Sequence, residues 1–141
     1  MVAGRGTVYV DMVGDLFHPG HVALLRAARG FGERLLVGVL SDDVVAAYKR
    51  KPIMTLAERV TVIEACRYAD AVLPDAPYRV TTEFLDLHDI DVVVHGDDLA
   101  ADAVEEAFGP VARAGKLRLV PYTGGVSTTE LIRRCRTTAP W

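Results

Sequence analysis

Short runs of aliphatic and β-branched residues alternate along the chain with segments in which apolar residues recur every three or four positions. The runs are almost continuously apolar, which is typical of strands buried on both faces of a parallel sheet. We expect five strands, at 7–12, 34–41, 70–74, 91–96 and 116–122. We expect helices between them, within 19–32, 42–49, 55–69, 81–89 and 101–115, and a last helix from 127.

This alternation predicts right-handed βαβ units, and hence a single-domain α/β fold with a doubly wound parallel sheet of about five strands. Local signals mark several helix ends. Thr55 and Glu58 have the spacing of a capping box, and Gly30 or Gly32 is a candidate for the end of the first long helix. In folds of this class, ligands bind beyond the carboxyl ends of the strands, where the strand order reverses.

Length and composition agree with one globular domain. The chain has 141 residues, half of them hydrophobic and a quarter charged, and a net charge of −3. Because there is no general basic field, we expect no nucleic-acid partner. No apolar stretch has membrane-spanning length, no signal peptide is evident, and the two cysteines form no CxxC. We therefore expect a cytoplasmic protein with reduced thiols and no membrane partner.

The segment "DLFHPGH", residues 15–21, places two of the four histidines at the start of the first helix. Pro19 suits a first helical position, and Gly20 lets an anion approach the backbone. The helix N-terminus attracts phosphate, and His18 and His21, three positions apart, can face the same point. The pattern favours a polyphosphate site. A metal site would lack an obvious third ligand, and histidines that only cap the turn are the structural alternative.

This segment resembles the HxGH signature of the nucleotidylyltransferase superfamily, in particular of the cytidylyltransferases that act on phosphocholine, phosphoethanolamine and glycerol 3-phosphate. Further segments resemble that family's other landmarks in the family's order: "LLVGVLSDD", "YKRKPIMTLAERVTVIEACRYADAVLPDAPY", "DVVVHGDD" and "GGVSTTELI". The resemblance covers residues 7–134. It implies a Rossmann-like, HxGH nucleotidylyltransferase fold.

The resemblance also implies a reaction. A phosphomonoester oxygen attacks the α-phosphorus of CTP, which gives a CMP conjugate and pyrophosphate, with Mg²⁺ accompanying the CTP and no dedicated protein metal site. Catalytic roles are implied for His18 and His21, on the triphosphate, and for Lys49, which would bridge the α-phosphate and the anionic group of the acceptor. A homodimer is implied as well.

The same resemblance implies nucleotide contacts by loop and helix-start residues, namely Val13, Gly14, Gly20, Asp97, Thr123, Val126, Ser127, Thr128 and Thr129. Asp97 would recognise the cytosine amino group, and 127–129 would hold phosphate through hydroxyl and N–H groups. N-capping of the next helix is the alternative role of Asp97 and Ser127. Acceptor contacts are implied for Asp11, Lys49, Arg59 and Tyr78. For Arg59 the alternative is a salt bridge on the helix surface.

Departures from the family pattern bear on the ligands. Met12 and Gly14 replace a glycine and an aromatic residue before the histidines, and Tyr122 replaces an arginine that would contact the triphosphate. Leu99 and Ala100 stand where phosphocholine enzymes have a second cage aromatic, so choline ranks low. We rank 2-hydroxyethylphosphonate first as the acceptor, phosphoethanolamine second and glycerol 3-phosphate third.

The altered loop and the arginine-rich composition resemble, more narrowly, the cytidylyltransferase domain of bifunctional fosfomycin-biosynthesis enzymes, which also carry a phosphoenolpyruvate mutase domain. A fused catalytic domain is therefore an expectation. We take 1–137 as the cytidylyltransferase domain and 138–141 as a tail or linker edge. Adenylyl transfer and a non-catalytic nucleotide-binding module are the alternatives. The "GGVSTTELI" ending favours CTP, and the presence of both histidines with Lys49 favours catalysis.

Overall fold

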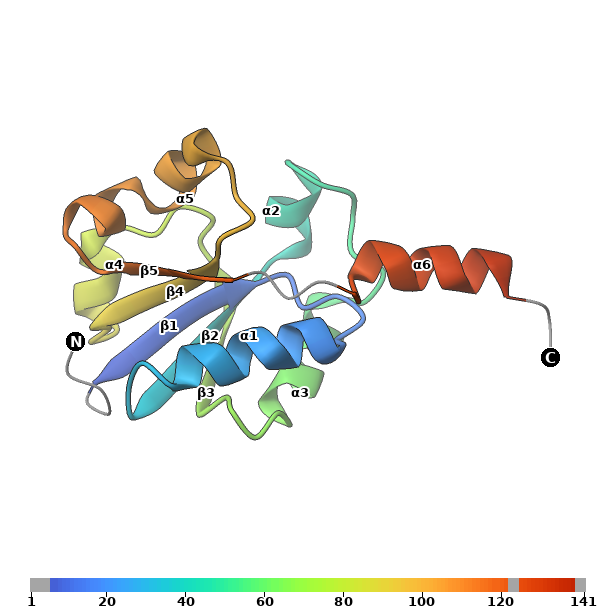
Figure 1. Cartoon of the computed structure of the whole chain (residues 1–141), viewed down its shortest axis with the longest axis horizontal. Coiled ribbons are helices and arrows are strands. Elements are labelled where there is room, and N and C mark those ends of the chain that lie inside the picture. The colour runs from blue at the N-terminus through green and yellow to red at the C-terminus, as the bar shows by residue number, and fades with distance from the viewer. Residues whose placement is uncertain (1–5, 122–124, 139–141) are drawn as a thin grey trace.

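A five-stranded parallel sheet forms the centre of the computed structural model, which describes residues 6–121 and 125–138 (Figure 1). The strands are β1 (Thr7–Met12), β2 (Arg34–Leu40), β3 (Ala71–Ala76), β4 (Val92–Gly96) and β5 (Leu117–Val120). Their order is β3-β2-β1-β4-β5, and each neighbouring pair is parallel. The expected doubly wound α/β fold is confirmed, and the strand order reverses between β1 and β4.

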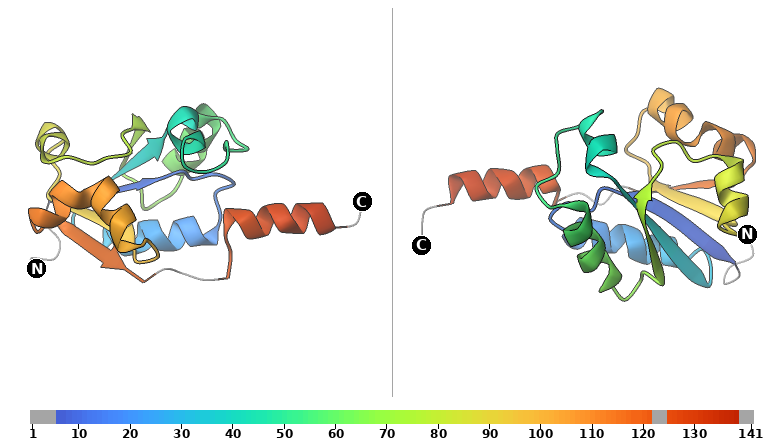
Figure 2. Two further views of the ribbon diagram at one scale, coloured as in Figure 1. Left: turned by 90° about the horizontal axis from the view of Figure 1, so that it is seen from above. Right: turned by 180° about the vertical axis from the view of Figure 1, so that it is seen from behind.

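Helices cover both faces of the sheet. They are α1 (Pro19–Arg29), α2 (Asp42–Ala46), α3 (Leu56–Glu64), α4 (Thr82–Leu87), α5 (Ala101–Arg113) and α6 (Thr128–Thr137). Helices α1 and α3 lie on one face, and α4 and α5 on the other (Figure 2). Helix α6 projects away from the rest of the molecule and contains no buried residue.

Alternation along β1 divides the core between the two faces. Val8 and Val10 pack with Ile63 of α3, whereas Tyr9 between them packs with Phe108 of α5. Successive side chains of a strand point to opposite sides, so a strand covered on both faces is apolar at nearly every position. This explains the continuous apolar runs in the sequence.

Short sequence signals correctly predicted several of the helix ends. The Thr55–Glu58 capping box is formed, and Gly30, rather than Gly32, is the C-cap of α1. The segment expected to be helical over 42–49 is shorter, because α2 ends at Ala46 and a turn follows. That turn carries Lys49, so the lysine is on a loop and not on a helix.

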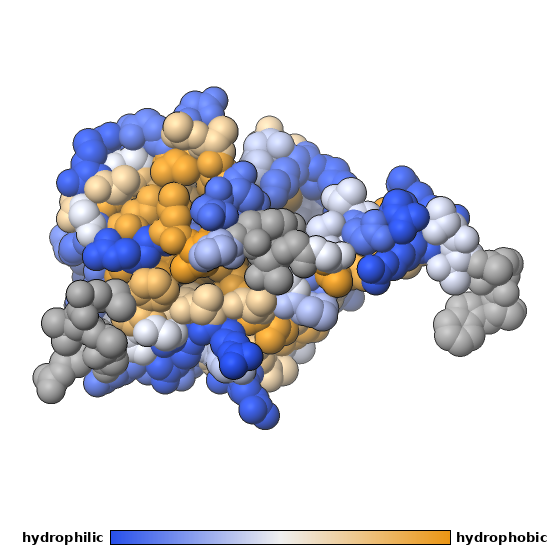
Figure 3. Space-filling model, viewed as in Figure 1, coloured by the Kyte–Doolittle hydropathy of each residue, from blue (hydrophilic) through white to orange (hydrophobic). Residues whose placement is uncertain are grey.

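The surface differs between the edge strand and α6. Apolar side chains gather over the side of the sheet that ends in β5, where Leu119 is 48% exposed (Figure 3). Hydrophilic residues cover most of α6 in the same view. Within 6–121 and 125–138, no helix is long and apolar enough to cross a membrane.

Candidate active site

A cavity of about 520 Å³ opens at the carboxyl ends of the strands, where the strand order reverses. Most of the residues that the sequence nominated line it: Asp11, Val13, His18, Gly20, His21, Lys49, Tyr78, Val126, Ser127, Thr128 and Thr129. They come from β1, the start of α1, the turn after α2, the loop after β3 and the start of α6. The fold thus brings together five segments that are far apart in the sequence.

The histidine turn is held by its own backbone. His18 is the N-cap of α1, and its Nδ1 accepts a hydrogen bond from the Gly20 N–H at 3.0 Å. The His21 Nδ1 accepts one from the His18 N–H at 3.1 Å, which completes a capping box. Because both Nδ1 atoms are acceptors, each neutral ring carries its proton on Nε2. The ring centroids lie 3.9 Å apart.

Burial keeps both histidines neutral. Burial first, and then the nearby His18 and Lys49, lower the pKa of His21 to about 4, against the opposing charge of Asp15. Burial also lowers the pKa of His18. At neutral pH the pair therefore offers two N–H donors without adding positive charge to the cavity.

Gly20 is required by the packing of this turn. A Cβ at this position would lie 2.7 Å from Cε1 of His18 and 3.0 Å from the carbonyl oxygen of Val126. A side chain there would push apart the histidine turn and the segment that leads into α6. The glycine thus permits a close approach between two parts of the protein, in addition to the approach of an anion expected from the sequence.

Asp15 joins three segments of the site. Its carboxylate is almost fully buried and accepts hydrogen bonds from the N–H groups of Ile53, at 2.8 Å, and Met54, at 2.9 Å. Arg50 lies 3.4 Å from the same carboxylate, and the carbonyl of Asp15 accepts from the Thr128 hydroxyl at 2.9 Å. No role for Asp15 was predicted from the sequence. Its only sequence signal was an acidic residue directly before the histidine turn.

The start of α6 closes the cavity. The Ser127 hydroxyl accepts from the Glu130 N–H at 3.0 Å and caps the helix. The expected capping role of Ser127 is therefore present, and the residue also lines the cavity. Helix N-termini of this length attract anions. Thr123 was expected to contact the nucleotide, and Tyr122 stands where the family has an arginine. Both lie outside the described residues.

The cavity also has acidic and aromatic lining residues. Asp11, on β1, is buried. This burial raises its pKa from an ordinary 3.8 to about 6, and the nearby His95 opposes part of the rise. Tyr78 stands beside Tyr48, with ring centroids 5.0 Å apart. His95, on β4, and Tyr48 line the cavity but were missed in the sequence. Sequence spacing gave no sign that these two residues face Asp11.

Arg59 is placed differently from the sequence expectation. Its side chain is fully buried and does not line the cavity. Nη1 donates to the carbonyls of Val13, at 2.7 Å, and Leu40, at 2.8 Å; Nε donates to that of Met54, at 3.2 Å. Nη2 pairs with Asp42 at 2.5 Å. Arg59 therefore positions the ends of β1 and β2 and the loop between α2 and α3, which carries Lys49. It makes neither the acceptor contact nor the helix-surface salt bridge that the sequence led us to expect.

Two further nominated residues lie beside the cavity without lining it. Gly14 has a φ of +70°, and a Cβ there would lie 2.6 Å from Cδ1 of Ile63. The replacement of the family's aromatic residue by glycine therefore serves a backbone conformation. Asp97 is exposed after β4, while its neighbours Gly96 and Asp98 line the cavity. Of these two neighbouring carboxylates, Asp98 is the one that lines the cavity.

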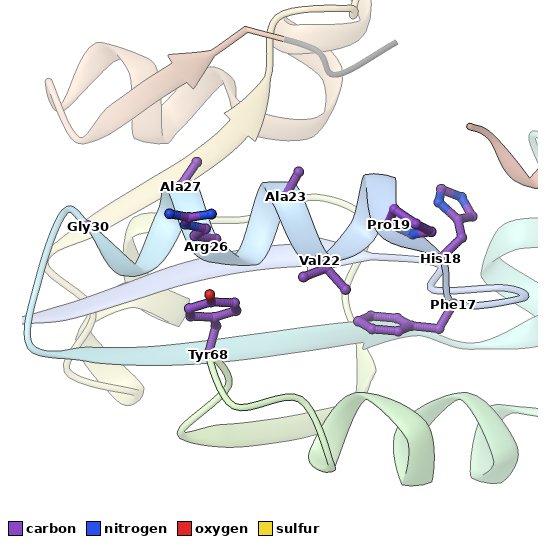
Figure 4. Close-up of a pocket in the computed structure, with 9 residues that line it drawn as sticks. All are labelled: Phe17, His18, Pro19, Val22, Ala23, Arg26, Ala27, Gly30 and Tyr68. Atoms are coloured by element: carbon purple, nitrogen blue, oxygen red, sulfur yellow. The ribbon is translucent and has the colours of Figure 1, made fainter. Parts of the chain in front are cut away.

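A second hollow runs along the outer side of α1 (Figure 4). It is an open groove of about 880 Å³, and its walls include Phe17, Val22, Arg26 and Tyr68. His18 lies at one end of this groove as well as at the cavity. The groove lacks the convergent polar groups of a catalytic site, and the cavity at the strand ends is the candidate active site.

The fold and the site define a nucleotidyltransferase-type α/β domain, and sequence comparison gives the family. The profile described as "Cytidylyltransferase-like" matches residues 14–134, and the chain belongs to this family. Ethanolamine-phosphate cytidylyltransferases of Dictyostelium discoideum and Mus musculus are 43% and 41% identical to it over 128 and 129 residues. Choline-phosphate cytidylyltransferase A of Homo sapiens is 35% identical over 142 residues.

These matches cover 90%, 90% and 94% of this chain but only 36%, 32% and 37% of the relatives, so the chain spans about a third of their length. Among solved structures, a lipopolysaccharide core biosynthesis protein from Thermoplasma volcanium matches with a TM-score of 0.68 at 22% identity, over 87% of this chain and all of that one. A pantothenate synthetase from Thermus thermophilus matches with 0.62 at 16%, over 90% of this chain and 61% of that one. These two structures support the fold alone.

Proposed function

We propose that the chain is a CTP-dependent cytidylyltransferase that transfers CMP to phosphoethanolamine and releases pyrophosphate. One observation carries the proposal. A single cavity gathers His18, His21, Lys49 and the start of α6, and it also contains Asp11 beside two tyrosines. Groups that suit a triphosphate and a group that suits an ammonium therefore share one space. Membership of the cytidylyltransferase-like family supports the reaction type.

The rate of the proposed reaction depends on how the two substrates are placed more than on proton transfer. A phosphate oxygen of the acceptor attacks the α-phosphorus of CTP, and the bond between this phosphorus and the oxygen that leads to the β-phosphate breaks. A phosphomonoester is largely dianionic at neutral pH, so its attacking oxygen has no proton to lose. Acceleration then depends on bringing two anions together in line and on stabilising their charge.

The described groups suit those tasks. The two histidines would donate their Nε2–H groups to phosphate oxygens, and they enter the reaction neutral because burial depresses their pKa values. Lys49 would supply positive charge between the α-phosphate and the acceptor, since a compact ammonium on a flexible stem can follow charge as it moves. The free N–H groups of the start of α6 would hold the departing pyrophosphate.

Mg²⁺ is proposed to enter with CTP. Within the described ranges, no group of three or more His, Cys, Asp or Glu side chains is placed to hold an ion. Asp15, at the cavity, already accepts two backbone hydrogen bonds. These residues do not form a cage, and triphosphate oxygens would supply most ligands, as is usual for this ion with nucleotides. When bound, Mg²⁺ would neutralise part of the negative charge of the triphosphate.

The preferred acceptor changes from the sequence expectation. Two of the relatives described above are named ethanolamine-phosphate cytidylyltransferases, which supports phosphoethanolamine over 2-hydroxyethylphosphonate. The comparisons give no support to a fused phosphoenolpyruvate mutase domain or to fosfomycin biosynthesis. Asp11 points the same way, because a buried carboxylate with a pKa of about 6 is ionised at neutral pH and gains from a cationic partner. Glycerol 3-phosphate, which lacks a cation, stays third.

The groove along α1 supports a proposed homodimer. Phe17, Val22 and Tyr68 give it apolar walls (Figure 4), and open apolar surface of this kind is stabilised by burial against a partner. A second copy there would lie beside His18 and the catalytic turn. Sedimentation equilibrium is expected to give twice the 15.3 kDa of one chain, and a monomer at micromolar concentration would contradict this.

A pyrophosphate-release assay tests the proposed function. The chain is incubated with Mg²⁺, each of CTP, ATP, GTP and UTP, and each of phosphoethanolamine, phosphocholine, glycerol 3-phosphate and 2-hydroxyethylphosphonate. We expect the highest kcat/KM with CTP and phosphoethanolamine. A higher value with ATP would make the chain an adenylyltransferase, and nucleotide binding without pyrophosphate release would make it a binding module.

A further inference from the structure

Tyr48 lines the cavity, and in the sequence it is the neighbour of the proposed catalytic lysine. Its ring centroid is 5.0 Å from that of Tyr78 and 5.5 Å from Nζ of Lys49. The segment after α2 therefore contributes three consecutive residues to the cavity, Tyr48, Lys49 and Arg50, and the first of them is aromatic. The loop after β3 contributes the second ring.

Both rings lie within the electrostatic reach of Asp11. Burial first, and then the charges of Asp11 and Tyr78, raise the pKa of Tyr48 to about 12. Burial, Glu106 and Asp11 raise the pKa of Tyr78. Both phenols therefore stay neutral and present π faces near a carboxylate. An ammonium ion is attracted by such faces and by the carboxylate at once.

We propose that Tyr48 is a specificity-determining residue for the acceptor. Its ring and that of Tyr78 form two aromatic walls of the cavity that also contains Asp11, and these walls select an acceptor with an ammonium head over one with a neutral head. The first wall sits next to Lys49, so recognition of the cationic head and placement of the phosphate are coupled through one turn. This inference rests on the proposed function and deepens it.

The position of Tyr48 makes the proposal testable without unfolding the protein. Its side chain is 42% exposed, and truncation of a side chain this exposed costs little stability. A merely structural role, in which Tyr48 supports the lysine turn, would lower turnover equally with every acceptor. A role in selection changes the ratio between acceptors. Val62, on α3, is 39% exposed and does not line the cavity, which makes Val62→Ala a matched control.

The experiment measures kcat and KM for phosphoethanolamine and for 2-hydroxyethylphosphonate at saturating CTP. The second acceptor has a hydroxyl in place of the ammonium, and a direct carbon–phosphorus bond in place of the ester oxygen. Wild type, Tyr48→Ala, Tyr48→Phe and Val62→Ala are compared. We expect Tyr48→Ala to lower kcat/KM for phosphoethanolamine about tenfold, chiefly through KM, and to change that for the phosphonate less than about twofold. Tyr48→Phe keeps the π face and is expected to stay within about threefold of wild type. Val62→Ala should match wild type.

The outcomes distinguish a failure of the role of Tyr48 from a failure of the proposed cytidylyltransferase function. Equal losses with both acceptors, or a loss in Tyr48→Phe as large as in Tyr48→Ala, would overturn the role of the ring in selection while leaving the transferase activity in place. A wild-type preference for 2-hydroxyethylphosphonate would overturn selection for an ammonium. A wild-type chain that released no pyrophosphate from CTP with any acceptor would overturn the proposed function and this inference with it.

Discussion

Replacement of Arg59 separates its positioning role from a direct contact with substrate. In Arg59→Met the carbonyls of Val13, Leu40 and Met54 lose their guanidinium donors, and Asp42 loses its ion-pair partner. Asp42 is one-third exposed and recovers part of its solvation, whereas the buried carbonyl of Leu40 does not. Breaking a buried charged network by removing one member costs about 3–5 kcal/mol. We expect a loss of about 4 kcal/mol of unfolding free energy, and a fall in Tm on the order of 10 °C.

Urea unfolding followed by circular dichroism measures this loss. Arg113→Met is the control, because Arg113 forms an exposed ion pair with Glu105 and such pairs contribute about 0–1 kcal/mol. Arg59→Lys keeps the charge but not the planar fork, and about half of the loss is expected to remain. A loss below about 1 kcal/mol in Arg59→Met, together with a large rise in KM for the acceptor, would refute this reasoning and restore the contact expected from the sequence.

Other changes test individual groups of the cavity. Lys49→Ala is expected to lower kcat about a hundredfold or more with an unchanged Tm, while Lys51→Ala, exposed and outside the cavity, should keep wild-type turnover; similar kcat values in a pyrophosphate assay would contradict this. Asp11→Asn should raise the unfolding free energy by about 3 kcal/mol at pH 7. Burial raises the pKa of Asp11 from 3.8 to about 6, so folding favours the protonated carboxyl, and the wild type loses that stability as pH rises through 6. The gain should vanish at pH 4, and an equal gain at both pH values would count against a raised pKa. Asp15→Asn should weaken the hydrogen bonds from the Ile53 and Met54 N–H groups, and amide hydrogen exchange at these two residues should become faster. Unchanged exchange there would show that Asp15 does not fix the loop between α2 and α3.

The sequence predicted those features that depend on neighbours along the chain. Strand positions followed from continuous apolar runs, because a strand covered on both faces has no polar side to show. The Thr55–Glu58 capping box and the Ser127 cap need only residues within one helical turn, and both are formed. The histidine pair, three positions apart, is held together for the same reason.

Features that depend on distant partners were missed or misplaced. The carbonyl and carboxylate partners of Arg59 lie up to 46 positions away, so an arginine on a helix gave no sign of being buried. Tyr48 and Tyr78 meet because α2 ends early and its turn folds toward the loop after β3. Asp15 binds backbone N–H groups 38 and 39 positions along the chain, and backbone groups leave no pattern in a sequence.

A crystal structure of the chain with CTP and Mg²⁺ would show whether the two histidines, Lys49 and the start of α6 bind one triphosphate. We expect the triphosphate in the cavity at the strand ends, with phosphate oxygens within hydrogen-bond distance of Nε2 of His18 and His21. Lys49 should lie nearby, and the N–H groups at the start of α6 should bind the terminal phosphates. CTP bound in the groove along α1, or bound in the cavity with the triphosphate turned away from both histidines, would contradict this expectation.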